Sequence, residues 1–159
     1  MLKRVSIFVD VQNIYYTVKE IYGCHFNYNK FILDVTKNRE LIKAIAYAIN
    51  KGDEKQIKFQ KILENIGFEV KLKPFIQRSD GSRKGDWDIG ITIDILEYVK
   101  KSDIIVLASG DGDFGLLIDK IKKDHDVIAE VYGVQELTAN SLIKKATKFI
   151  PIKDDLLLS

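Results

Sequence analysis

One stretch near residue 110 constrains the fold of this 159-residue chain more than any other. Residues 104–107 (Ile-Ile-Val-Leu) form a continuous apolar run, which is typical of a strand buried on both faces of a sheet. From Leu116 onwards, apolar residues recur at the spacing of a helix. Asp111 and Asp113 lie between these two patterns, so they stand where a strand ends and a helix begins. In an open parallel sheet, ligands bind at this edge.

The same turn also has an interpretation without any ligand. Gly110 and Gly112 permit a tight turn because they lack a Cβ atom. Asp113 can cap the helix that follows by accepting hydrogen bonds from its free N–H groups. A capped turn of this kind binds nothing, so the decision depends on where the other aspartates of the chain lie.

The rest of the chain repeats this succession of strand-like and helix-like segments. We expect strands over residues 5–9, 40–49, 68–73, 104–107, 126–132 and 149–152. We expect helices over residues 14–22, 55–66, 88–101, 116–121 and 137–145, the second of them with a single apolar face. Strands that alternate with helices predict an α/β fold with a mainly parallel sheet covered on both faces.

Three of these segments leave alternatives open. Residues 23–38 fit a short helix or an ordered loop, and their aromatic side chains either pack locally or stack on nucleic-acid bases. The alanines of residues 40–49 leave a helix open there. Residues 88–101 alternate as a strand does, but their length favours a helix with Asp88 as its N-cap and with Gly90 leaving room beside Asp94.

Composition indicates one globular domain. Hydrophobic residues make up 46% of the sequence and charged residues 30%, which is an ordinary balance for a folded protein. We expect a single domain over residues 1–153 and a short tail over residues 154–159, whose leucines cover a sheet edge or the partner subunit of a homo-oligomer. The formal net charge is only +2, so a nucleic-acid partner has to be recognised by a local patch.

Several absences in the sequence predict a soluble, cytoplasmic protein. Cys24 is the only cysteine, so no intrachain disulfide can form, as is usual in a reducing compartment. Residues 1–4 lead directly into a strand pattern, without the apolar stretch of a signal peptide. No apolar run reaches the roughly 20 residues that cross a membrane, so we expect no membrane partner.

Acidic residues recur at the expected ends of strands and starts of helices. Asp10 ends the first strand, and Asn13 follows within the turn. If the strands are parallel, Asp10 and Asp111 meet at one edge of the sheet. Helix starts that can face this edge contribute Asp88, Asp94 and Asp113. Two carboxylates about 4 Å apart repel by roughly 4 kcal/mol at an effective dielectric constant of about 20, so such a group requires a cation or raised pKa values. Oxygen ligands without nearby Cys or His favour Mg²⁺ or Mn²⁺ over zinc.

The sequence also offers groups that could hold a phosphate backbone near these acids. A divalent cation that is open on one side can activate water and bind phosphate oxygens. Candidate phosphate contacts from the basic segment around residues 71–85 are Lys71, Lys73, Arg78, Arg83 and Lys84. A solvated loop is the alternative for this segment, and a structural hydrogen bond or salt bridge is the alternative for Asp94. The predicted acidic centre and the basic segment beside it together favour phosphodiester hydrolysis as the reaction.

Three pieces of the chain together resemble the NYN domain family, the LabA-like branch of the PIN-like nucleases. They are Ile7–Asn13, Lys84–Asp94 and Ser109–Phe114, in the order and spacing of the family. The resemblance spans nearly the whole chain. It implies a PIN-like three-layer α/β/α sandwich and RNA cleavage that depends on Mg²⁺ or Mn²⁺.

The resemblance further implies roles for individual residues. Asp10, Asp88 and Asp111 would be the main metal ligands. Asp94 and Asp113 would complete the acidic site, and Asn13 and Ser109 would orient it. The chain departs from the family at Val11, where a glycine usually follows the first aspartate. It also departs at Asp86 and Trp87, which add one residue before Asp88, so that Asp86 competes with Asp88 for its role.

These observations predict a metal-dependent ribonuclease that cleaves RNA phosphodiester bonds. The alternative is an RNA-binding or regulatory module that keeps the fold but works without turnover, which the small net charge and the altered turn after Asp10 favour. A phosphatase or nucleotide-binding domain lacks support, because the sequence contains no glycine-rich phosphate-binding loop.

Overall fold

The computed structural model describes residues 1–74, 76–77, 83–84 and 86–159 of the chain. At its centre lies a six-stranded sheet in the order β4-β3-β1-β7-β8-β9, in which every neighbouring pair is parallel. These strands are β1 (Lys3–Asp10), β3 (Arg39–Asn50), β4 (Glu69–Pro74), β7 (Ile104–Ala108), β8 (Ile128–Gly133) and β9 (Lys148–Pro151). The prediction of a parallel sheet is confirmed.

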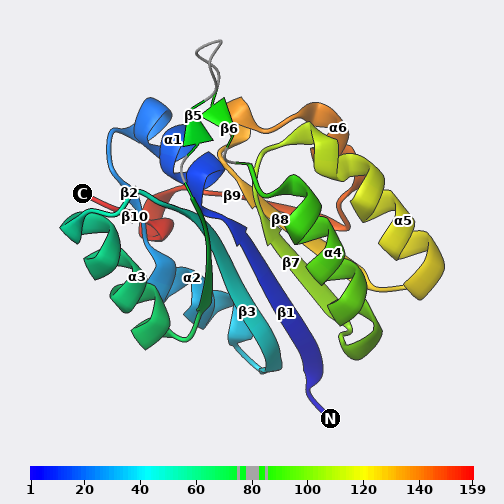
Figure 1. The fold of residues 1–159 in the computed structure, drawn as a ribbon. Coiled ribbons are helices and arrows are strands. Elements are labelled where there is room, and N and C mark those ends of the chain that lie inside the picture. The colour runs from blue at the N-terminus through cyan, green and yellow to red at the C-terminus, as the bar shows by residue number, and fades with distance from the viewer. Residues whose placement is uncertain (75, 78–82, 85) are drawn as a thin grey trace.

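Helices cover both faces of this sheet, as Figure 1 shows. One face carries α1 (Val11–Tyr22), α2 (Tyr28–Thr36) and α3 (Glu54–Ile66), and the other carries α4 (Asp88–Tyr98), α5 (Gly115–His125) and α6 (Asn140–Lys145). An apolar cluster fills each of the two interfaces, because successive strand residues point to opposite faces. In β1, Val5, Ile7 and Val9 pack beneath α1 and α2, while Phe8 packs beneath α4. The three-layer α/β/α architecture is therefore confirmed.

The order of the strands reverses between β1 and β7. From β1 the chain moves outward through β3 to β4, then returns to the other side of β1 and moves outward through β7, β8 and β9. Because parallel crossovers are right-handed, the helices of the two halves cover opposite faces. The loops after β1 and β7 consequently diverge, and such a reversal is where open α/β sheets bind ligands.

The structure resolves the three segments that the sequence left open. Residues 23–38 form the short strand β2 (His25–Phe26) and α2, with Phe26, Tyr28 and Phe31 buried in the core. The alanine-rich segment is the strand β3, whose Ala44, Ala46 and Ala48 pack towards α1 and α2. The last ambiguous segment is α4, followed by the 3₁₀ helix η1 (Val99–Lys101).

The apolar face predicted for residues 55–66 is only partly used. Within α3, Leu63 is fully buried, but Ile57 and Ile62 are exposed. The strand nearest to α3 along the chain is β4, which forms the edge of the sheet and offers little surface to cover. Its position at the edge is consistent with Pro74, which cannot donate a backbone hydrogen bond. None of the helices in the described part of the chain is both long enough and apolar enough to span a membrane.

Two short antiparallel strand pairs lie outside the central sheet. The carboxyl edge of the sheet carries the antiparallel pair β5 (Ile76–Gln77) and β6 (Arg83–Lys84), which Figure 1 shows above the ends of the strands. The C-terminal residues form the 3₁₀ helix η4 (Asp154–Leu156) and β10 (Leu157–Leu158), which pairs antiparallel with β2. The backbone N–H of Asn27 donates to the carbonyl of Leu156 at 2.8 Å. The tail thus packs on β2 of its own chain, and a role for it in an oligomer stays a prediction.

Candidate metal centre

Hydrogen bonds join the ends of β1 and β7, where the strand order reverses. Asp10 is the last residue of β1 and caps α1, accepting from the backbone N–H of Asn13 at 3.4 Å. The hydroxyl of Ser109 donates to the other carboxylate oxygen of Asp10 at 3.0 Å. The backbone N–H of Gly110 donates to the side-chain oxygen of Asn13 at 2.8 Å. The side chains of Asn13 and Ser109 therefore link the end of β1 to the turn that follows β7.

Asp111 organises the turn that follows β7. It caps the 3₁₀ helix η2 (Gly112–Phe114) by accepting from the backbone N–H of Asp113 at 2.9 Å. The prediction that Asp113 caps the next helix is wrong, because α5 begins without a side-chain cap. The glycines of this turn have negative φ and serve close packing instead: a Cβ atom on Gly112 would lie 2.8 Å from that of Ala139.

Three carboxylates converge above these strand ends. Asp88, Asp111 and Asp113 each offer an oxygen atom, and these atoms lie within 4.8 Å of one another. Asp88 is the first residue of α4. The prediction that it is the N-cap is wrong, because Trp87 occupies that position and makes no capping hydrogen bond with its side chain. Of the predicted metal ligands, Asp88 and Asp111 are in this three-carboxylate group, whereas Asp10 lies beside it.

Burial and mutual repulsion raise the pKa values of two of these acids. Burial is the main cause that raises the pKa of Asp10 to about 6, against the lowering effect of its bonds from Ser109 and Asn13, and the charge of Asp111 raises it further. The pKa of Asp88 rises to about 7, first because of burial and then because of the charge of Asp111 and a hydrogen bond with it. Near neutral pH, this edge of the sheet therefore holds protons or another positive charge.

The start of α4 is anchored by Trp87. Its indole N–H donates to the carbonyl of Ala48 at 2.9 Å, and its ring lies 5.3 Å from that of Tyr47. The ammonium of Lys73 lies 4.6 Å from the centre of the same indole and donates to the carbonyl of Asp86 at 2.9 Å. A Cβ atom on Gly90 would lie 2.6 Å from the indole, so Gly90 makes room for Trp87 and not, as expected, for Asp94.

Asp94 is separately neutralised within the protein. Its carboxylate accepts from the hydroxyl of Tyr47 and from the ammonium of Lys71, both at 2.7 Å. It is not one of the three converging carboxylates. The structure thus places Asp94 in an ion pair, which is the alternative that the sequence left open, and gives Lys71 a partner other than phosphate.

The other predicted site residues lie around this centre. Asp86 is exposed and close enough for its charge to raise the pKa values of Asp10 and Asp88, although it is outside the three-carboxylate group. Lys73 contacts the start of α4 as described above. Arg78 and the side chains of Arg83 and Lys84 lie outside the described residues.

The three-carboxylate group suits a hard divalent cation. Two oxygen ligands of one Mg²⁺ are at most about 4.2 Å apart, so carboxylate oxygens that lie within 4.8 Å of one another need only small movements to share a cation. Within the described residues, none of the ion pairs involves Asp10, Asp88, Asp111 or Asp113. Burial and the charge of Asp111 raise the pKa of Asp88, and a bound cation would offset both effects.

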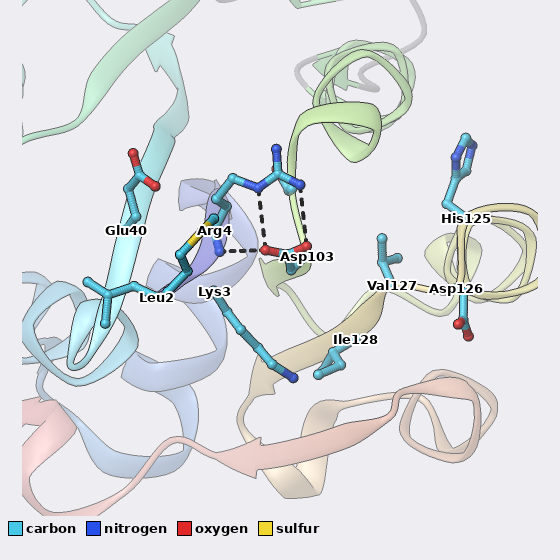
Figure 2. A pocket seen from close by; sticks show the side chains of 11 residues that line it. Leu2, Lys3, Arg4, Glu40, Asp103, His125, Asp126, Val127 and Ile128 are labelled. Carbon is cyan, nitrogen blue, oxygen red and sulfur yellow. Dashed lines mark hydrogen bonds and ion pairs between the residues drawn. The ribbon is translucent and has the colours of Figure 1, made fainter.

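A hollow lies at the opposite, amino edge of the sheet, where the described residues contain no such group of converging carboxylates. Figure 2 shows that it is lined by residues near the N-terminus, by Asp103 and by the start of β8. Arg4 donates to Asp103 from its backbone at 2.8 Å and from its guanidinium at 3.4 Å, and these bonds lower the pKa of Asp103. Arg4 and Asp103 of this hollow therefore neutralise each other, unlike the acids at the carboxyl edge.

Comparison with known proteins agrees with the architecture. The family model of the NYN domain matches residues 4–154. The chain belongs to the NYN domain family. It is 32% identical to the low amplitude and bright protein LabA of Synechococcus elongatus, an alignment that covers 95% of this chain and 84% of that protein. A crystal structure of a protein of unknown function from Vibrio parahaemolyticus is 49% identical and superposes with a TM-score of 0.94, covering 99% of this chain and 97% of that one.

Membership of the NYN family, part of the PIN-like nuclease superfamily, supports a nuclease in general terms. Sequence reasoning on this NYN domain missed the residues that set the position of Asp88. Trp87 is the only tryptophan of the chain, and its place between two aspartates was a signal that the sequence contained. Nothing in the local sequence relates Trp87 to Ala48 or Lys73, because these partners lie on the separate strands β3 and β4.

Proposed function

We propose that this NYN domain is a metal-dependent ribonuclease that cleaves RNA phosphodiester bonds with Mg²⁺ or Mn²⁺. The convergence of the Asp88, Asp111 and Asp113 carboxylates at the reversal of strand order carries the proposal. Repulsion among the acids, seen in the raised pKa of Asp88, supports a site that requires a cation. The family supports RNA as the substrate class.

Each residue of the centre then has a distinct task. Asp88, Asp111 and Asp113 would hold the cation, and Asp10 would complete the ligand set from the end of β1. Ser109 and Asn13 fix Asp10 and the turn after β7, so the oxygens are arranged before the cation binds. A bound divalent cation supplies charge for the phosphate oxygens and lowers the pKa of a bound water. We propose that Lys73, Arg78, Arg83 and Lys84 contact the RNA backbone, because cations beside an acidic centre offset its repulsion of phosphate.

Substitution of Asp111 tests this function. Asp111→Asn removes one carboxylate charge and should lower cleavage of a labelled single-stranded RNA, in Mn²⁺ or Mg²⁺, by at least 100-fold. Asp119→Asn, which changes an exposed acid on α5, is the matched control and should cleave like the unmodified protein. Chelation of the metal should stop cleavage by both proteins. Equal cleavage by Asp111→Asn would show that a contaminating nuclease is responsible.

The burial of Asp10 favours a second candidate function. Its carboxylate is only 9% exposed and already accepts two hydrogen bonds within the protein, which makes it a weaker ligand than the sequence implied. A domain with such a site could bind RNA without turnover. Binding of RNA that persists in chelator, with no cleavage products in Mn²⁺ or Mg²⁺, would favour this function over the first.

A further inference from the structure

We propose that the outer face of α1 is a stacking platform for unpaired bases of the RNA, formed by Tyr15 and Tyr16 and flanked by Lys19. This inference rests on the proposed function, because it names the form of RNA that the site accepts. The aromatic residues of α2 and β2 that the sequence offered for this role are buried in the core. The platform is therefore a different set of rings, exposed on the helix that begins at the metal centre.

Burial along α1 separates its two faces. Val11, Ile14 and Val18 point into the core, whereas Tyr15 is 40% exposed and Tyr16 is 48% exposed. The two tyrosines lie outside this buried set and keep close to half of their surface in water. Two adjacent rings therefore present a combined aromatic surface to the solvent.

Contacts between neighbouring side chains hold this surface in order. The rings of Tyr15 and Tyr16 meet edge to face with their centres 5.3 Å apart. His25 of β2 stacks on Tyr15 with a centre distance of 6.0 Å, and the ammonium of Lys19 lies 5.5 Å from the centre of the same ring. Tyr15 thus contacts both His25 and Lys19, and it in turn supports the more exposed Tyr16. Ordered rings lose little conformational entropy when a base stacks on them.

The platform is continuous with the metal centre. The cap of α1 is Asp10, and Asn13, which binds the turn after β7, lies one helical turn before Tyr16. With a rise of 1.5 Å per residue, Tyr16 lies about 9 Å along the helix axis from Asp10. An RNA strand whose phosphate lies at the carboxylates can therefore place a neighbouring base on Tyr16 and a phosphate near Lys19.

The chemistry of the platform selects unpaired RNA. Stacking on an aromatic side chain needs a base whose face is free, and bases within a duplex are covered by their neighbours. Stacking tolerates every base, since each has a π face, and an adjacent cation adds attraction for the backbone. The geometry thus points to single-stranded RNA with little preference for sequence at this position.

Binding measurements in chelator test the platform without relying on cleavage. The dissociation constant of a fluorescent single-stranded RNA is measured by anisotropy, with the same RNA annealed to its complement as the second ligand. Tyr16→Ala should weaken binding of the single strand by about five-fold or more, the effect of losing one stacked base, and leave duplex binding unchanged. Tyr16→Phe keeps the ring and should bind like the unmodified protein. Leu33→Ala, which removes an exposed apolar side chain from α2, is the control for general loss of surface.

Several outcomes would overturn the proposal. Unchanged binding by both Tyr16→Ala and Tyr15→Ala would show that RNA does not use these rings, while cleavage that requires Asp111 would leave the ribonuclease function standing. Failure of the unmodified protein to bind any RNA would remove both the platform and its RNA substrate. A change in oligomeric state of Tyr16→Ala by size-exclusion chromatography, without a change in RNA affinity, would identify the rings as a protein contact.

Discussion

Asp88 and Asp111 face one another across the start of α4 and the end of β7, and their chemistry depends on that approach. An isolated aspartate loses its proton far below neutral pH. Burial and the neighbouring charge of Asp111 raise the pKa of Asp88 to about 7. Asp10, buried at the end of β1, has a pKa of about 6. At the scale of the residue, the proposed cation would therefore compete with protons for these carboxylates and bind more tightly as the pH rises.

The first prediction is that the metal-free protein becomes less stable as pH rises from about 4 to about 7. In this window Asp10 and Asp88 bind more protons in the folded protein than in the unfolded chain, where the pKa of an aspartate is near 3.8. Stability must then fall with increasing pH, because unfolding releases the protons. The melting temperature in chelator, measured across this range, should therefore decrease, and Asp88→Asn should flatten the decrease. A melting temperature that rises over the same range in the unmodified protein but not in Asp88→Asn would contradict these pKa shifts.

At the scale of the element, the position of Asp88 depends on how α4 is attached to the sheet. Trp87 anchors the first turn of α4 to β3 and carries Lys73 of β4 on its ring. About two turns after Trp87, Asp94 binds Tyr47 of β3 and Lys71 of β4. Two sets of polar contacts thus tie α4 to the same pair of strands, which makes this helix a rigid support for a ligand.

The second prediction concerns this attachment. Asp94→Asn removes the ion pair with Lys71 and weakens the bond from Tyr47, so it should lower the free energy of unfolding by about 1–3 kcal/mol, measured by urea denaturation. Glu69→Gln breaks the more exposed pair of Lys43 and Glu69 between the same two strands and should cost less than about 1 kcal/mol. Unchanged stability of Asp94→Asn, together with loss of metal binding, would make Asp94 a ligand after all.

At the scale of the whole molecule, the centre exists because the strand order reverses. The parallel strands β1 and β7 are neighbours although about 100 residues separate them, and their carboxyl ends bring Asp10 and Asp111 to one edge. The helices of the two halves leave that edge uncovered, and α4 then supplies Asp88. A cation bound there would connect segments that are distant along the chain and that belong to both halves of the sheet.

The third prediction is that a divalent cation stabilises the entire domain. At a concentration one hundred times its dissociation constant, Mn²⁺ should add about 2.7 kcal/mol to the free energy of unfolding and raise the melting temperature by several degrees at pH 8. Asp111→Asn should lose this stabilisation, and Asp119→Asn should retain it. If the two variants responded equally to Mn²⁺, the cation would be bound elsewhere on the surface.

Local patterns in the sequence were sufficient for the elements that hold the centre. The apolar runs before Asp10 and Asp111 predict buried strands, and the periodicity after Asn13 predicts a helix, because strand and helix patterns repeat within a few residues. The parallel sheet with helices on both faces followed from the alternation of these elements. The acidic character of one edge was therefore determined by the order of residues along the chain.

Only the tertiary structure decided which acids meet. Asp94 and Asp113 were both predicted to complete the acidic site, yet Asp94 is bound by Lys71 and Asp113 joins Asp88 and Asp111. The rotation of α4 on the sheet makes this distinction, and that rotation is set by Trp87 packing against Tyr47 and bonding to Ala48. These residues lie about 40 positions apart in the chain, so no local pattern can relate them. Their contact arises because packing and hydrogen bonding between distant segments determine where each carboxylate points.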